Sequence, residues 1–202
     1  MMMPYILCFG LPGSGKSTSA KILEDALPDF IRYNERDLRA SLGMHPFDAS
    51  ADTQHQIALS DSFFNGILEQ LRFGKSLLVD RAGVSERYRA WSYRLAGDFG
   101  ADILAIWHDL PSEIAFERIK NRPDEHMDWE RRIKHNDPEL RMKLQERWTE
   151  PVSELDNSEY DRVSMIKYDT HLHTIQRIKV NPEISDFVVV VENILLQPYV
   201  RP

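Results

Sequence analysis

The sequence predicts an α/β fold in which a mostly parallel sheet is flanked by helices on both faces. Short apolar runs alternate along the chain with longer amphipathic stretches. A glycine-rich loop joins the first apolar run to the first helical stretch, and no repeat or Pro/Gly/Ser linker divides the 202 residues. Strands connected through helices at this spacing run parallel, because each helix returns the chain to the same edge. We therefore expect one three-layer domain over residues 1–202, with five strands and a helical lid.

The first half of the chain provides two strands and three helices. Residues 5–9 are an unbroken apolar run, typical of a buried strand, and residues 30–33 form a second short run. Residues 17–27 carry apolar side chains at helical spacing, and a shorter helix follows over residues 36–42. Residues 53–73 repeat apolar positions every three or four residues and end at a glycine, which predicts one long helix.

The second half continues the alternation. We expect strands at residues 76–80, 103–107 and 163–168, and helices at residues 85–99 and 111–121. Pro111 suits the first turn of its helix. Residues 118–150 are strongly charged and form the predicted lid. Residues 179–202 form a C-terminal extension, whose apolar run at 187–191 has the composition of a strand that lacks a partner.

Composition excludes several classes of protein. Apolar residues make up 42% of the chain and charged residues 28%, with no apolar run near the roughly 20 residues of a membrane-spanning helix. The N-terminus lacks the pattern of a secretory signal, and Cys8 is the only cysteine. We therefore expect a cytoplasmic protein without disulfides or a membrane partner. The net charge of −7 opposes coating of nucleic acid by charge alone, although it allows a local basic groove.

Residues 10–18 match the phosphate-binding pattern G-x-x-x-x-G-K-[ST], between a strand and a helix. Glycines let successive backbone N–H groups face phosphate oxygens, and the helix that follows adds its positive end. Lys16 supplies a charge to the β- and γ-phosphates, and the Ser17 hydroxyl can ligate Mg²⁺. The alternative is a glycine-rich turn with an incidental lysine. The expected nucleotide-binding residues are Gly13, Ser14, Gly15, Lys16, Ser17 and Thr18.

Charged residues follow the second and third strands, at the edge where parallel sheets bind substrates. They are the stretch 34–39, Asn-Glu-Arg-Asp-Leu-Arg, and the pair Asp80-Arg81. A hydroxyl that receives a phosphoryl group from the nucleotide needs a carboxylate to take its proton and a cation nearby. We expect Asp37 to be that carboxylate and Arg39 to bind the molecule that carries the hydroxyl, the acceptor. An acid in the first turn of a helix is also favourable for its dipole alone. Asp80 lies where such proteins contact Mg²⁺ or the acceptor, beside Arg81, and its alternative role is to cap the next element.

These motifs give the chain a resemblance to P-loop kinases of the phage-type 5′-hydroxyl polynucleotide kinase group, within a wider family that includes zeta toxins and small-metabolite kinases. The resemblance rests on the loop with its strand, residues 34–41, residues 77–80 with 85–87, and residues 117–122. Residues 160–170 resemble the family's last strand weakly. The resemblance implies the P-loop NTPase fold, ATP and Mg²⁺ as cofactors, and a nucleic acid 5′-end as partner.

One departure concerns the base. The family commonly has Asn-Arg-Asp-Asp after its second strand, with the first Asp as the base and an arginine three residues later. A gap-free match places Arg36 at the base, whereas a slip of one residue places Asp37 there and brings Arg39 only two residues later. Either the turn carries an extra residue or the acceptor differs, and Glu35 remains an alternative base.

Arg118 and Arg122 lie four residues apart on one helix. The resemblance implies that such arginines close over the phosphates, so we expect Arg122 to stabilise the transition state and Arg118 to contact the nucleotide. Within residues 81–94, four arginines alternate with aromatic side chains. This pattern either follows a single strand of nucleic acid, bound in part through Arg87 and Arg89, or forms an amphipathic helix. His108 could also line the site.

The sequence thus predicts an ATP- and Mg²⁺-dependent kinase in which Lys16, Asp37 and Arg122 act in catalysis. Arg39, Asp80 and Arg81 organise the acceptor, and Ser17 with Asp80 holds the metal. The favoured acceptor is the 5′-hydroxyl of a polynucleotide, by resemblance. A small metabolite, nucleoside or drug is the alternative acceptor, which the charge of −7 favours. A regulatory ATPase without an organic acceptor is the alternative of another class.

Overall fold

A computed structural model describes residues 3–42, 53–81, 85–121, 142 and 160–197. These residues form a sheet of six strands in the order β2-β3-β1-β4-β5-β6, in which β1 to β5 are parallel and β6 is antiparallel. The strands are β1 (Pro4–Gly10), β2 (Phe30–Asn34), β3 (Ser76–Asp80), β4 (Asp102–Asp109), β5 (Val163–Asp169) and β6 (Thr174–Lys179). The α/β fold with a mostly parallel sheet is confirmed, with one more strand than predicted.

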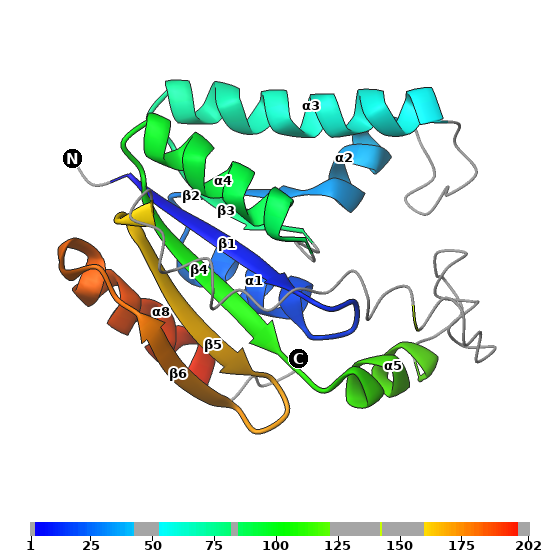
Figure 1. The fold of residues 1–202 in the computed structure, drawn as a ribbon, viewed down its shortest axis with the longest axis vertical. Coiled ribbons are helices and arrows are strands. Elements are labelled where there is room, and N and C mark those ends of the chain that lie inside the picture. The colour runs from blue at the N-terminus through cyan, green and yellow to red at the C-terminus, as the bar shows by residue number, and fades with distance from the viewer. Residues whose placement is uncertain (1–2, 43–52, 82–84, 122–141, 143–159, 198–202) are drawn as a thin grey trace.

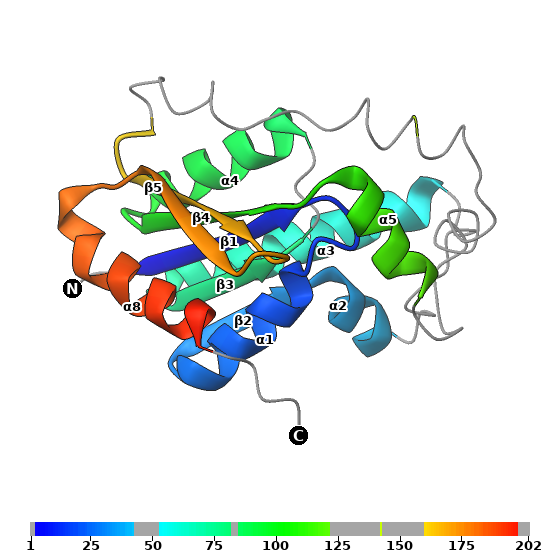
Figure 2. The ribbon, with the colours of Figure 1, turned by 90° about the horizontal axis from the view of Figure 1, so that it is seen from below.

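Helices cover both faces of this sheet (Figures 1 and 2). One face carries α1 (Lys16–Ala26) and α8 (Ser185–Leu196), and the other carries α3 (Thr53–Arg72) and α4 (Glu86–Asp98). The short helices α2 (Glu35–Ser41) and α5 (Ser112–Lys120) begin at the carboxyl ends of β2 and β4. The 3-10 turn η3 (Pro182–Ile184) precedes α8. None of the helices in the described part of the chain has the length and apolar character to cross a membrane.

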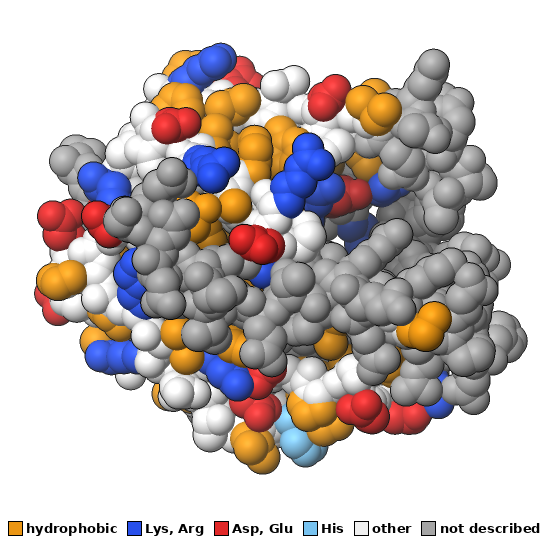
Figure 3. All heavy atoms as spheres, in the orientation of Figure 1, with side chains coloured by type: hydrophobic (Ala, Val, Ile, Leu, Met, Phe, Trp, Pro, Cys, Tyr) orange, Lys and Arg blue, Asp and Glu red, His pale blue; other side chains and the backbone are white. Residues whose placement is uncertain are grey.

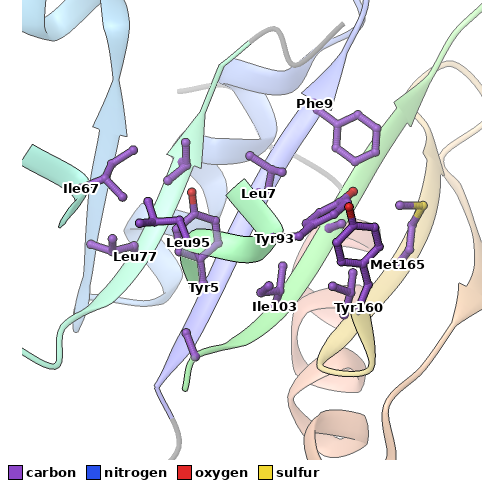
Figure 4. Packing of buried hydrophobic residues seen from close by; sticks show 14 of the residues in the cluster. Tyr5, Leu7, Phe9, Ile67, Leu77, Tyr93, Leu95, Ile103, Tyr160 and Met165 are labelled. Carbon is purple, nitrogen blue, oxygen red and sulfur yellow. The ribbon is translucent and has the colours of Figure 1, made fainter. Parts of the chain in front are cut away.

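The alternation of side chains along each strand divides the core in two. In β1, Tyr5, Leu7 and Phe9 face α3 and α4, whereas Ile6 and Cys8 face α1 and α8, and all five are fully buried. The first of these clusters also draws on β3, β4 and β5 (Figure 4). Because β1 is apolar on both faces and central in the sheet, the loop that follows it starts from a rigid base.

The prediction for the C-terminal extension was wrong. Residues 187–191, predicted as an unpartnered strand, belong to α8. The buried side chains of α8 are Val188, Val191, Glu192 and Leu195, which is helical spacing, and the helix packs against α1. The valines favour a strand locally, but burial of this stripe outweighs that preference. The sixth strand is instead β6, which a tight turn pairs with β5. Most of the predicted lid, residues 122–141 and 143–150, lies outside the described residues.

Candidate active site

The loop between β1 and α1 needs its glycines. Gly13 and Gly15 have φ angles of 85° and 97°, a region that glycine adopts far more readily than other residues. A Cβ atom on Gly13 would lie 2.3 Å from the carbonyl oxygen of Ala115 in α5, and one on Gly15 would lie 3.2 Å from Thr170 Cγ2. The loop is therefore pressed between α5 and the segment after β5, with its backbone at the N-terminus of α1.

Two side chains of the loop point to separate partners. Lys16 is buried, and its Nζ donates a hydrogen bond to the carbonyl oxygen of Leu11 at 2.8 Å, across the loop. Ser17 Oγ donates to Asp80 Oδ1 at the end of β3, at 3.2 Å. Strand pairing between β1 and β3 brings these residues together, since Cys8 lies opposite Asp80 in the parallel register. The structure thus joins the predicted metal pair, Ser17 and Asp80.

Asp80 also connects the loop to β2. Its side chain is 2% exposed, and its Oδ2 accepts hydrogen bonds from Asn34 Nδ2 at 2.6 Å and from Arg32 Nη2 at 3.2 Å. The same Asn34 caps α2, because its Oδ1 accepts from the backbone N–H groups of Arg36 and Asp37. One asparagine therefore fixes both the carboxylate at the end of β3 and the start of the helix that carries the predicted base.

Arg32 links Asp80 to that base. Its Nη1 donates to Asp37 Oδ2 at 3.0 Å, with Glu24 as a more distant partner at 3.5 Å. Burial alone would lower the pKa of this guanidinium, but the neighbouring carboxylate of Asp80, helped by those of Asp37 and Glu24, raises it above its usual value. Arg32 is therefore charged, and 62% of the Asp37 side chain is exposed.

The second acid of α2, Glu35, lies between two arginines. Its Oε1 accepts from Arg39 Nη2 at 3.0 Å, and its Oε2 forms an ion pair with Arg81 Nε at 2.9 Å. The Arg39 side chain is 8% exposed, that of Arg81 22% and that of Glu35 29%. The structure thus brings the predicted acceptor residues Arg39 and Arg81 to one carboxylate, directly beside Asp80.

Arg118 of α5 connects to the loop through Thr170. Its Nη1 donates to Thr170 Oγ1 at 2.8 Å and its Nη2 to the Thr170 carbonyl at 3.0 Å. Thr170 Oγ1 in turn donates to the carbonyl oxygen of Ser14 at 2.8 Å. These bonds hold α5, the segment after β5 and the loop in one arrangement. The other predicted lid arginine, Arg122, lies outside the described residues.

His108 lies beneath the loop rather than in the open site. It is 1% exposed, and its Nδ1 lies 3.3 Å from the Phe9 carbonyl and 3.2 Å from the Ile106 carbonyl. Burial, together with the positive charge of Lys16, lowers the pKa of His108 to about 4. The imidazole is therefore neutral at pH 7, and the His108 backbone lies against Gly10, where a Cβ would be 2.6 Å from the His108 carbonyl oxygen.

The arginine-rich stretch after β3 corrects one expectation. Arg89 is fully buried and stacks on the Phe9 ring, 5.4 Å from its centroid, so it is not available to a nucleic acid. Trp91 is half-buried against Phe64, with ring centroids 4.0 Å apart. The stretch is thus an amphipathic helix with a buried face, and Arg87 remains exposed on its other side.

Three residues of this site had no predicted role: Arg32, Asn34 and Thr170. Arg32 is the charged residue of a short strand whose other side chains are aromatic, aliphatic or amide. A charge in that position is unusual, and it could have indicated a role for Arg32 in the site. Asn34 carries the N-cap signal, an asparagine directly before an acidic first turn. Thr170 gave no signal, because its contact with the loop spans 156 positions of the sequence.

The residues fit a nucleotide with Mg²⁺. Gly13 and Gly15 turn the loop with positive φ angles directly before the N-terminus of α1, and the buried Lys16 lies beside it, an arrangement that suits an anion such as phosphate. Mg²⁺ prefers oxygen ligands and uses one or two protein groups with substrate phosphates, and Ser17 Oγ with Asp80 Oδ1 offers such a pair. Within the described residues no group of three or more His, Cys, Asp and Glu could form an all-protein metal centre.

A family model described as an AAA domain matches residues 6–148. No curated protein matches the sequence. Among solved structures, a chain of the Pnkp1/Rnl/Hen1 RNA repair complex is 20% identical with a TM-score of 0.56, over 73% of this chain and 47% of that one. APS kinase CysC of Mycobacterium tuberculosis, in complex with AMPPNP and APS, is 14% identical with a TM-score of 0.53, over 95% and 98%.

A further structure, APE1195, is 16% identical with a TM-score of 0.57, over 96% of this chain and 97% of that one. The chain spans less than half the length of the RNA repair chain that it matches. At these identities the similarity concerns the fold alone.

Proposed function

We propose that this chain, which belongs to the family of AAA domains, is an ATP- and Mg²⁺-dependent kinase that phosphorylates a hydroxyl group. The observation that carries the proposal is a continuous series of side-chain contacts from the loop to an exposed carboxylate. Ser17 contacts Asp80, Asp80 contacts Arg32, and Arg32 contacts Asp37. A loop that served nucleotide binding alone would not need this connection to a solvent-exposed acid.

These contacts support the following roles for the residues. Lys16 and the loop N–H groups bind the phosphates, and Ser17 with Asp80 would hold Mg²⁺, which neutralises charge on the β- and γ-phosphates. Asp37 accepts the proton of the acceptor hydroxyl, whose oxygen forms a bond to the γ-phosphorus while the bond from that phosphorus to the ADP oxygen breaks. Arg118, and Arg122 by resemblance, contribute positive charge from the side of α5.

Asp37 is a better base than Glu35. Both oxygens of Glu35 already contact an arginine, whereas one guanidinium reaches one oxygen of Asp37. Asp37 is also more exposed, 62% against 29%, so a hydroxyl can approach it without displacing another side chain. Relative to the family pattern, the acid and the arginine are exchanged at residues 35 and 36. The accessible carboxylate of α2 is therefore Asp37, two residues after Glu35.

The acceptor that we favour is the 5′-hydroxyl of a polynucleotide, by resemblance, and a similar fold occurs in an RNA repair complex. A small metabolite is the second candidate. It is supported by the net charge of −7, and by a similarity to APS kinase that extends over nearly the whole of both chains.

Phosphoryl transfer from γ-labelled ATP with Mg²⁺ tests the proposal. The acceptors are a 5′-hydroxyl oligonucleotide, a panel of nucleosides and small hydroxyl metabolites, and water, with Lys16→Ala and Asp37→Asn as variants. Label on the oligonucleotide that both variants abolish supports a polynucleotide kinase. Label only on a small acceptor supports the second candidate, and release of inorganic phosphate alone would indicate a regulatory ATPase.

A further inference from the structure

The hydroxyl group of Thr170, in the turn between β5 and β6, connects two parts of the proposed nucleotide site. It accepts a hydrogen bond from Arg118 Nη1 and donates one to the carbonyl oxygen of Ser14 in the loop, both at 2.8 Å. We propose that Thr170 is a positioning residue for the phosphates of the nucleotide, acting by orienting the peptide between Ser14 and Gly15. This inference deepens the proposed function and rests on it, because it concerns how the same loop binds phosphate.

Chemistry fixes the direction of both hydrogen bonds. An arginine side chain has donors only, so the Thr170 oxygen accepts from Arg118. A backbone carbonyl has no donor, so the hydroxyl proton of Thr170 points to Ser14. Arg118 Nη2 also donates to the backbone carbonyl of Thr170 at 3.0 Å, so both Nη groups bind this one residue. A hydroxyl that accepts from a cation is polarised and donates more strongly, so Arg118 strengthens the contact between Thr170 and the loop.

The contact at Ser14 determines the direction of the next N–H group in the loop. The carbonyl and the N–H of a trans peptide point in opposite directions, and the described part of the chain has no cis peptide bond. Because the Ser14 carbonyl points to Thr170, the Gly15 N–H points away from the turn. Gly15 is the N-cap residue of α1, so its N–H adds to the donors that the helix offers to an anion. A reversed peptide would direct a carbonyl oxygen at the phosphates and repel them.

Packing between Thr170 and Gly15 supports the same orientation. The φ angle of Gly15 is 97°, and a Cβ atom there would lie 3.2 Å from Thr170 Cγ2 and 3.4 Å from Thr170 Oγ1. The threonine side chain therefore lies directly against the backbone of the peptide that it orients. Figure 2 shows the turn beside the start of α1. Rotation of the peptide thus requires the turn to move as well.

The turn is fixed by hydrogen bonds that do not involve the Thr170 side chain. Asp169 Oδ1 accepts from the backbone N–H groups of His171 and Leu172, at 2.7 Å and 2.9 Å. Residues 171–173 are exposed, and a histidine side chain is visible at the lower end of Figure 3, where the turn lies in Figure 1. The half-buried Thr170 side chain instead faces the loop. Its hydrogen bonds are therefore not required to close the turn, and they act on the loop.

Inorganic tripolyphosphate is the probe, because it carries phosphates without a base or a ribose. Its affinity is measured by calorimetry with Mg²⁺. Thr170→Val replaces the hydroxyl by a methyl group of similar size and should bind the probe about tenfold more weakly, because the Ser14 carbonyl and Arg118 lose a partner. Thr170→Ser keeps the hydroxyl and should bind it within about twofold of the wild type. Thr174→Val replaces an exposed threonine at the start of β6 and is the matched control, with wild-type binding expected.

A double-mutant cycle tests the connection to Arg118. If Thr170 and Arg118 act on the loop as one unit, the combined loss in Thr170→Val with Arg118→Gln should be smaller than the product of the two single losses. Single losses that simply multiply would overturn the connection, because the two residues would then act independently. Thr170→Ala, which places no bulk against the loop, gives the same comparison where Thr170→Val does not fold.

Several outcomes would overturn the role of Thr170. They are wild-type binding of tripolyphosphate in Thr170→Val, an equal loss in Thr174→Val, and a loss in Thr170→Ser as large as that in Thr170→Val. Weaker binding of a non-hydrolysable ATP analogue alone, with tripolyphosphate binding unchanged, would also overturn it, because Thr170 would then act on the base or the ribose.

Failure of this inference and failure of the proposed function give different results. Tripolyphosphate binding that depends on the Thr170 hydroxyl, without label transfer to any acceptor, refutes the kinase and keeps the role of Thr170. Label transfer by the wild-type chain, with unchanged tripolyphosphate binding in Thr170→Val, keeps the kinase and refutes that role.

Discussion

The two sides of the site are built in different ways. On the phosphate side, the loop of residues 10–18 uses its own backbone, and its lysine donates to a carbonyl only five residues away. On the proposed acceptor side, the carboxylates of α2 pair with side chains of neighbouring strands, Asp37 with Arg32 of β2 and Glu35 with Arg81 directly after β3. Phosphate groups are the same in every nucleotide, so one local motif suffices for them. The proposed acceptor side is instead assembled from side-chain ion pairs, and those of Arg81 with Glu35 and of Arg32 with Asp80 join residues far apart in the sequence.

The largest expected effects are on the kinetics of phosphoryl transfer, and they should differ between variants of the two sides. Lys16→Ala should lower phosphoryl transfer by about 1000-fold and weaken ATP binding, because a buried charge on the phosphates is lost. Asp37→Asn should lower kcat by about 100-fold with the KM for ATP unchanged, because it removes only a proton acceptor. Steady-state kinetics with varied ATP measure both. An Asp37→Asn variant with normal kcat would move the base to Glu35 or Asp80.

The stability of the fold should depend on pH through His108, which lies beneath the phosphate loop. His108 has a pKa of about 4 in the folded chain and about 6.5 when unfolded, so the unfolded chain binds more protons between these values. Stability is therefore lost as pH falls from about 6.5 to about 4, by about 3 kcal/mol in all. Urea unfolding at several pH values checks this. His108→Asn should remove this contribution, and an unchanged pH slope in that variant would contradict the assignment.

A pair of glycine substitutions tests how rigid the loop is. Gly13→Ala should lower the free energy of unfolding by about 2 kcal/mol and weaken nucleotide binding, because φ is positive there and the new Cβ would meet the Ala115 carbonyl. Gly97→Ala, in α4 with open space around it, should stabilise the chain by about 0.5–1 kcal/mol. Denaturant titration compares the two. Equal effects would mean that the loop adapts to a side chain.

The smallest effects concern the arginines of α4. Arg89→Gln should cost about 1–2 kcal/mol of stability, since it removes a fully buried cation from the face of Phe9. Arg87→Gln should change stability by less than about 0.5 kcal/mol, because Arg87 is exposed. Thermal melts measure both. If single-stranded nucleic acid binds this helix, the Arg87 variant should also show a smaller dependence of affinity on salt.

Much of the first 120 residues could be predicted because their signals are local. The strand at residues 5–9, the loop and the first helix are specified by neighbouring residues, and Asp80 stands out as an acid at the end of an apolar strand. The residues after 160 were harder. The valines of α8 have strand propensity, and only the burial of every third or fourth side chain against α1 explains the helix. β6 forms because its backbone pairs with the edge of β5.

The sequence by itself determined the phosphate loop, the parallel order of strand and helix, and the charged residues that meet at one edge of the sheet. These depend on backbone conformation and on periodicity, which are encoded within a few residues of one another. The tertiary structure alone decided that Asp37 is more exposed than Glu35, that Arg32 joins Asp80 to Asp37, and that Arg89 is buried while Arg87 is exposed. Ion pairs and burial depend on the distances between strands, and no local pattern of residues encodes those distances.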